Sequence, residues 1–219
     1  METFNYTTHT EKILADLYTP VAVYMRLRDI HPQSALMESS DYHGNDNSRS
    51  FSGIHPMANI QVGHGVIRST YPDGTVDETV IDTSVKGKAK DAVANAINDF
   101  ISHFKVEGEG KDFCGLYGYT TFNAVRYFED IDVKDATMEK NDAPDIYYIM
   151  YRDVIVFDHF NNSMQIISLA EDASDITDIL RAINKQNIKP YSFKPIGETT
   201  STLTNEEHKA NVRKCVKHC

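Results

Sequence analysis

The sequence predicts an α+β fold, made mainly of antiparallel sheets in a β-sandwich-like arrangement with flanking amphipathic helices. Two observations favour this class. In several short segments polar and apolar residues alternate, as in half-buried strands, and in other segments apolar residues recur at helical spacing. The chain has 219 residues, enough to bury a hydrophobic core, and its three Cys residues are too few for a disulfide scaffold.

The predicted strands are short and follow one another as a meander. They cover Ser34–Ser39, Ser50–Ile54, Met57–Gly63, Gly65–Tyr71, Thr75–Asp82, Phe113–Thr121 and the two arms of a hairpin, Ile146–Asp158 and Ser163–Ala170. One break between strands contains Pro72 and Gly74, which favour a tight turn because Pro fixes φ and Gly accepts positive φ. We therefore expect neighbouring strands to pair in antiparallel fashion.

Three amphipathic helices are expected to cover the sheets. Thr19 can cap the first of them and Pro20 suits its first position, so a helix should run over about residues 20–28. The strongest helical periodicity spans Ala89–Val106. Ser174 can cap a third helix, in which isoleucines and a leucine share one face.

The last part of the chain is predicted to be separate from the rest. Residues 1–190 form the expected main domain, and residues 191–203, which contain Pro195 and a Ser/Thr run, are predicted to be a linker. A helix should occupy residues 204–219, because Thr204 and Glu207 have the spacing of a capping box. Its apolar stripe has nothing left in the sequence to cover, so we expect the chain to be part of a longer polypeptide.

Composition excludes several classes of partner. The chain has 22 Lys and Arg against 32 Asp and Glu, so its net charge is −10. Nucleic-acid binding needs clustered basic residues, and an acidic chain makes it a poor expectation. The sequence contains neither a signal-peptide pattern nor a run of about 20 apolar residues. We therefore expect a soluble, cytoplasmic protein with no nucleic-acid or membrane partner.

The sequence contains none of the common motifs for nucleotide or zinc chemistry. Four residues near the C-terminus, His208, Cys215, His218 and Cys219, could in principle gather at a metal. The two cysteines lie one helical turn apart, and free Cys behaves as a small apolar residue, so a plain apolar seam is the favoured interpretation. We predict no catalytic residue and no metal ligand in this chain.

Glu38 is the residue whose position is most informative. A carboxylate at the end of an apolar strand is either exposed at the strand end or holds a cationic partner. Arg49 begins the next predicted strand, so a hairpin could bring its guanidinium near Glu38. Such a pair could bind the ammonium and the carboxylate of a zwitterion, and it could equally be a plain salt bridge.

Several motifs of this sequence occur in the same order in one enzyme family. They are Thr19-Pro20, Leu36-Met37-Glu38-Ser39, Ser48-Arg49-Ser50-Phe51, the Gly115–Tyr119 run leading into Arg126-Tyr127-Phe128-Glu129, and Ala143-Pro144-Asp145-Ile146-Tyr147-Tyr148. Each motif alone is weakly specific, but together they are in register over about 130 residues. The chain resembles the N-terminal portion of the anthranilate synthase component I family.

The resemblance implies a function. The family is a group of lyases that convert chorismate and ammonia into anthranilate and pyruvate with Mg²⁺, the first committed step of tryptophan biosynthesis, and a glutamine amidotransferase subunit, component II, supplies the ammonia. Tryptophan inhibits the enzyme, and by resemblance Glu38, Ser39 and Arg49 contribute to the tryptophan site. Met37 stands where the family has Leu, and Arg49 stands where relatives carry Lys.

The family's catalytic groups and its Mg²⁺-binding carboxylates belong to a C-terminal half that has no counterpart here. The resemblance makes residues 204–219 the start of the chorismate-binding domain, so the chain alone should lack synthase activity and hold no cofactor. Its exposed edges could support a homodimer. Two alternatives stay open: the equivalent portion of aminodeoxychorismate synthase component I, from folate synthesis, and a standalone amino-acid-binding module.

Overall fold

The computed structural model describes residues 3–38, 48–81, 88–129, 131, 133, 143–185, 192, 194–198 and 200–218, with side chains in the second helix from Asp91 onward. The chain divides into two compact units, residues 1–188 and 189–219. The strands are β1 Phe4–Thr7, β2 His9–Leu14, β3 Ala35–Met37, β4 Arg49–Gly63, β5 Val66–Thr70, β6 Val76–Val80, β7 Phe104–Glu107, β8 Leu116–Thr120, β9 Ile146–Asp158 and β10 Ser163–Ser168. The helices are α1 Pro20–Leu27, α2 Lys88–Ser102, α3 Ser174–Lys185 and α4 Asn205–Val216, with short 3-10 turns η1 Lys111–Phe113 and η2 Phe122–Tyr127.

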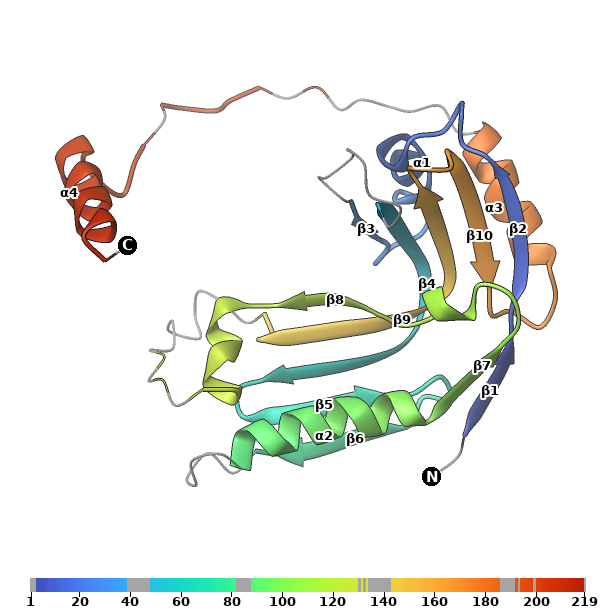
Figure 1. Cartoon of the computed structure of the whole chain (residues 1–219), viewed down its shortest axis with the longest axis horizontal. Helices are drawn as coiled ribbons and strands as arrows, with labels where there is room; N and C mark the ends of the chain where they lie inside the picture. The colour runs from blue at the N-terminus through green and yellow to red at the C-terminus, as the bar shows by residue number, and fades with distance from the viewer. Residues whose placement is uncertain are drawn as a thin grey trace. The chain divides into compact units, whose positions relative to one another are not determined.

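The first unit is an α+β structure, as predicted. Its main sheet has eight antiparallel strands, in the order β2-β10-β9-β4-β5-β6, with β3 added beside β4 and β8 added beside β9. A separate two-stranded sheet joins β1 and β7 in parallel. Helix α2 lies along β5 and β6, whereas α1 and α3 lie at the other half of the main sheet (Figure 1).

Strands β4 and β9 run through both halves of the main sheet and bend together (Figure 1). Sequence periodicity predicted two strands, Ser50–Ile54 and Met57–Gly63, where the structure has one continuous β4. The register of β4 on β9 shifts between Pro56 and Ala58. Pro56 cannot donate to the ladder, so a bulge here keeps the strand paired on both sides of the interruption.

The predicted helices form, with one correction. Thr19 caps α1, since its hydroxyl accepts a hydrogen bond from the Ala22 amide at 3.2 Å. The predicted helix Ala89–Val106 was too long, because α2 ends at Ser102 and the chain continues as β7. Phe104 pairs with Phe4 of β1, an N-terminal strand that the sequence analysis missed. Pairing between residues a hundred positions apart leaves no signal in the local sequence. The apolar spacing therefore predicted a helix that continues past the true end of α2.

The second unit is described by itself. It contains α4, whose predicted capping box is present: the Thr204 hydroxyl accepts from the Glu207 amide, and the Glu207 carboxylate accepts from the Thr204 amide at 2.8 Å. No helix in the described part of the chain is long and apolar enough to cross a membrane.

Three apolar clusters hold the first unit together. One lies between α2, η2 and the half of the sheet that contains β5, and a second lies between α1, α3 and the half that contains β10. The third gathers aromatic side chains from β4, β8 and β9, including Phe51, Tyr117 and Tyr151. Each half of the bent sheet therefore has its own core, and the long strands connect the two.

Two of the sequence motifs meet at the Asp145 carboxylate. Tyr127, at the end of η2, donates its hydroxyl to Asp145 Oδ2 at 2.9 Å, and Arg126 Nε lies 3.8 Å from the same oxygen. The Thr121 hydroxyl donates to Oδ1 at 3.3 Å. Tyr127 is buried, and Asp145 accepts the hydrogen bond that its hydroxyl donates. The carboxylate thereby fixes η2 against the start of β9.

Gly118 in β8 is required by close approach of the neighbouring strand. A Cβ at this position would lie 1.9 Å from the Tyr147 carbonyl oxygen, whereas a Cβ at Gly115 would meet nothing within 4 Å. We expect Gly118→Ala to lower the free energy of unfolding by about 2–3 kcal/mol, because backbone must move to accommodate the methyl group. Gly115→Ala is the matched control and should change it by less than about 0.5 kcal/mol. Urea denaturation of both variants measures the difference, and equal losses would contradict this account.

Asp145→Ala should lower the free energy of unfolding by about 1–3 kcal/mol, because it removes the acceptor of the Tyr127 hydrogen bond and the carboxylate that lies near Arg126. Tyr127→Phe alone should cost about 1 kcal/mol. In the Asp145→Ala background the same Phe substitution should cost less than it does in the parent chain, since the hydrogen bond to Asp145 is already lost. A double-mutant cycle by urea denaturation measures the coupling free energy between Asp145 and Tyr127. Strictly additive effects of the two substitutions would show that their hydrogen bond contributes nothing to stability.

Candidate functional site

A cavity of about 410 Å³ opens where the N-terminus of α1 meets the turn between β9 and β10. Its lining consists of Ala15, Tyr18, Thr19, Pro20, Glu38, Phe157, Asp158, His159 and Asn162. Several of these residues are held in place by hydrogen bonds. The Tyr18 hydroxyl donates to Asn184 Oδ1 at 2.8 Å, and the Ala15 amide donates to the Asn162 carbonyl at 2.9 Å.

Glu38 reaches this cavity because of the register of β3 on β4. Met37 lies opposite Phe51, so the next residue, Glu38, continues on the face that carries Ser50. The Ser50 hydroxyl is hydrogen-bonded to His159 Nε2 at 2.8 Å, and His159 also lines the cavity. The structure therefore places Glu38, an exposed residue, at the rim of a recess with an apolar wall formed by Pro20 and Phe157.

Arg49 and Ser39 are the other two residues predicted for the site. Arg49 begins β4 and lies on the opposite face from Glu38, where its guanidinium carbon is 5.4 Å from the centroid of the Phe113 ring. Its cross-strand partner is Asp158. Ser39 lies outside the described residues. The predicted hairpin between Glu38 and Arg49 thus exists, but strand alternation directs the two side chains to different faces of the sheet.

The polar groups of the cavity favour a positively charged guest. Two of the nine lining residues are carboxylates, Glu38 and Asp158, and none is Lys or Arg. Burial acts to raise the pKa of Asp158, but hydrogen bonds from Asn161 and the charge of Arg49 outweigh it and lower the pKa. Asp158 is therefore ionised at neutral pH. The Glu38 carboxylate beside an apolar wall suits a ligand that carries both an ammonium and an apolar group.

Sequence analysis missed the contribution of the hairpin tip to this cavity. The sequence predicted only that this segment, with Asp158, His159 and Asn162, is the end and turn of a hairpin. The structure confirms the hairpin. Their proximity to Glu38 depends on the pairing of β4 with both β3 and β9. The only local signal was their polar character.

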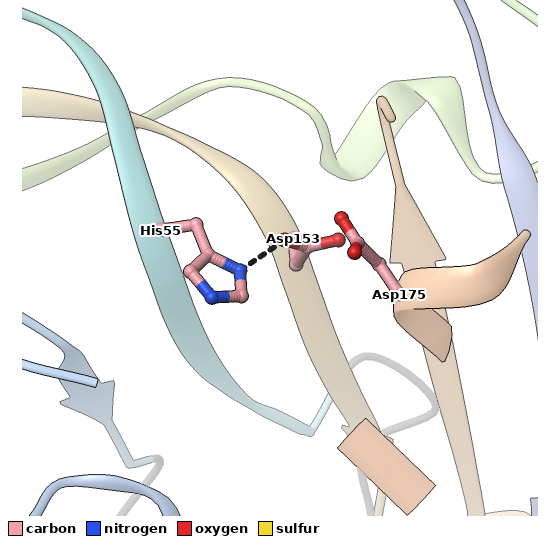
Figure 2. Close-up of side chains that lie close together, drawn as sticks. All are labelled: His55, Asp153 and Asp175. Carbon is pink, nitrogen blue, oxygen red and sulfur yellow. Dashed lines mark hydrogen bonds and ion pairs between the residues drawn. The ribbon is translucent and has the colours of Figure 1, made fainter. Parts of the chain in front are cut away.

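A second group of ionisable side chains lies at the bend of the main sheet (Figure 2). His55 Nδ1 donates to Asp153 Oδ2 at 2.6 Å, and Arg152 Nε donates to the same oxygen at 3.1 Å. Arg152 Nη2 lies 2.6 Å from Asp175 Oδ2 and 3.0 Å from His55 Nδ1. The His31 ring meets the His55 ring at 4.4 Å between centroids, nearly edge to face.

Four elements of the first unit bring these side chains together. His55 comes from the irregular part of β4, where its φ of 55° turns the backbone out of the regular strand. Asp153 and Arg152 come from β9, Asp175 from the first turn of α3, and His31 from the segment after α1. The sequence analysis did not single out this group, because its members are isolated in the sequence and share no motif spacing.

The group has a fully buried acid at its centre. The Asp153 side chain is 0% exposed. Burial acts to raise its pKa, but hydrogen bonds from His55 and Ser168 and the charge of Arg152 outweigh burial, so the pKa is lowered. Burial, followed by the charge of His55, lowers the pKa of His31. Because Asp153 is an ionised acceptor, the His55 nitrogen that faces it, Nδ1, carries a proton.

Known proteins resemble this chain over most of its length. The anthranilate synthase component 1 of Methanothermobacter thermautotrophicus is 27% identical over 165 residues, which cover 74% of this chain and 32% of that protein. The anthranilate synthase component 1 of Acinetobacter calcoaceticus is 28% identical over 206 residues, covering 90% of this chain and 38% of that protein. The chain thus spans about a third of the length of the curated relatives it matches.

Among solved structures, the anthranilate synthase component I of Streptococcus pneumoniae TIGR4 matches 80% of this chain and 35% of its own, with 21% identity and a TM-score of 0.36. The sequence profile of the chorismate binding enzymes matches residues 37–219. That match includes Glu38, Arg49 and most of the side chains of the cavity and of the sheet bend. His31 and the cavity residues on the α1 side precede it. The chain belongs to the chorismate binding enzyme family.

Proposed function

We propose that this chain is the N-terminal, regulatory and structural portion of an anthranilate synthase component I. The complete protein would convert chorismate and ammonia into anthranilate and pyruvate for tryptophan biosynthesis in the cytoplasm. The observation that carries the proposal is the name shared by the relatives, each of which is matched over only about a third of its length. The order of the motifs around Glu38 and Asp145, which resembles that of the family, supports it.

We further propose that the cavity beside Glu38 is part of a tryptophan feedback site. The Glu38 carboxylate would accept hydrogen bonds from the ligand ammonium, and the wall formed by Pro20 and Phe157 would contact the indole. Ser39 would contribute as the next residue along the chain. Arg49 is kept in the proposal by resemblance, but its guanidinium lies against Phe113 on the other face. We therefore expect its contribution to binding to be smaller than that of Glu38.

The proposal also assigns partners. A glutamine amidotransferase subunit, component II, would supply ammonia, and the catalytic acid–base histidine and the carboxylates for Mg²⁺ would belong to the remaining two thirds of the enzyme. The group at the sheet bend fits Mg²⁺ poorly, because it includes an imidazole and Mg²⁺ prefers oxygen ligands. The exposed edge of the sheet at β6 offers a surface for a homodimer.

The purified chain should be inactive as a synthase. Mixed with chorismate, Mg²⁺ and ammonium, it should produce no anthranilate, because the proposal places the catalytic groups in the missing portion. Anthranilate fluorescence over time is the measurement, with a complete anthranilate synthase component I as positive control. A fluorescence increase that depends on the chain would show that it carries catalytic residues of its own.

Tryptophan should bind the chain weakly, with a dissociation constant of about 1 mM or more, because only part of the proposed site is present. Chemical-shift changes in the isotope-labelled chain should be confined to the residues that line the cavity. Glu38→Gln should weaken binding at least ~10-fold by removing the charge that meets the ammonium. Arg49→Gln should have a smaller effect. Glu11→Gln, an exposed acid on β2, is the matched control and should leave binding unchanged.

Two results would contradict the effector site. An unchanged spectrum at high millimolar tryptophan would remove it, as would binding that Glu38→Gln leaves intact. Submicromolar binding by the chain alone would favour the standalone amino-acid-binding module instead, because half of a shared site should not bind so tightly.

A further inference from the structure

We propose that His55, Asp153 and Asp175 form a binding site for a divalent transition-metal ion at the bend of the main sheet, and that Arg152 takes the place of the ion in the metal-free protein. The ion class is that of Zn²⁺ and Co²⁺, which accept mixed nitrogen and oxygen ligands. This site is separate from the cavity beside Glu38. It does not depend on the proposed function.

The donor atoms are already gathered. The ligand atoms of His55, Asp153 and Asp175 all lie within 4.8 Å of one another. Figure 2 shows the Asp153 and Asp175 carboxylates facing each other, with the His55 ring on the other side of Asp153. One imidazole and two carboxylates make a donor set that zinc and related ions use, with further positions left for water or a fourth side chain. The ring of His31, adjacent to that of His55, offers a second imidazole.

The buried carboxylate supplies an independent reason to expect a ligand. Asp153 Oδ1 is buried and has no partner with hydrogen-bond geometry among the described residues, although the Ser168 hydroxyl is near enough to help lower the pKa. The Asp153 side chain is 0% exposed. A buried carboxylate oxygen without a donor is costly. A metal ion between the two acids would give that oxygen a partner.

Charge balance points to a divalent ion. Asp153 and Asp175 together carry two negative charges, and Arg152 supplies one positive charge through its contacts to both. The Arg152 side chain is 35% exposed, so it can swing into solvent when an ion arrives. A divalent ion would neutralise both carboxylates. On binding, His55 Nδ1 would release its proton to solvent and coordinate the metal through the lone pair that is freed.

The test is titration of the full chain with Co²⁺, followed by its visible absorption, and with Zn²⁺, followed by calorimetry. Cys215→Ser and Cys219→Ser are introduced first, so that thiolates near the C-terminus do not bind the ions. We expect one equivalent to bind, Zn²⁺ to displace Co²⁺, and Mg²⁺ not to compete. The bound ion should also raise the melting temperature, because the ligands hold β4, β9 and α3 together.

Variants distinguish this site from adventitious binding. His55→Gln and Asp175→Asn, which change partly exposed side chains, should each weaken binding at least ~10-fold, because each removes a ligand and Asp175→Asn also a charge. Asp153→Asn should do the same if it folds. Arg152→Gln should tighten binding at least ~10-fold, because it removes a competing positive charge. Asp178→Asn, an exposed acid one turn further along α3, is the matched control and should bind as the parent does.

Absence of saturable binding in the parent and in Arg152→Gln would overturn the proposal. Binding that survives both His55→Gln and Asp175→Asn would also overturn it, because the ion would then lie elsewhere. Neither result bears on tryptophan binding or on synthase activity, which are measured separately.

Discussion

The antiparallel pairing of β4 with β9 is the interaction on which the rest of the first unit depends. These two strands are the longest in the structure, at 15 and 13 residues, and every other strand of the main sheet is added beside one of them or beside its neighbours. Their shared bend divides the sheet into two halves with separate cores. Each half alone would be a small sheet with one helical layer, and continuous strands make the two fold as one body.

The bend is also where the sheet departs from regular geometry and where its most concentrated charges lie. The bulge near Pro56 frees His55 from the normal strand conformation, and this lets its ring reach the buried Asp153. A carboxylate at 0% exposure is stable only with cationic or donor partners. Arg152 and His55 provide these partners, and Arg152 also connects Asp175 to the sheet. The ionic group therefore fixes α3 to the bend, and Asp153 Oδ1 has no partner with good hydrogen-bond geometry among the residues that the structure describes.

The cavity beside Glu38 owes its shape to the same strand pairing. One end of β9 leads into the hairpin turn that supplies Asp158, His159 and Asn162, and β3 delivers Glu38 from the other side of β4. The recess is acidic and partly apolar, so it is better matched to an ammonium than to a carboxylate. Strand alternation places Glu38 at the cavity and Arg49 on the opposite face of the sheet.

Sequence by itself determined the α+β class, the caps of α1 and α4, the hairpin of β9 and β10, and Glu38 as a residue of interest, because these depend on local periodicity and on side chains within a few positions. Tertiary structure alone decided that β4 is continuous, that Phe104 belongs to a strand paired with Phe4, and that His55 meets Asp153 and Asp175. Those features arise from contacts between residues far apart in the chain. The secondary-structure propensity of a short segment does not predict such contacts, since they become favourable only once the sheet has formed.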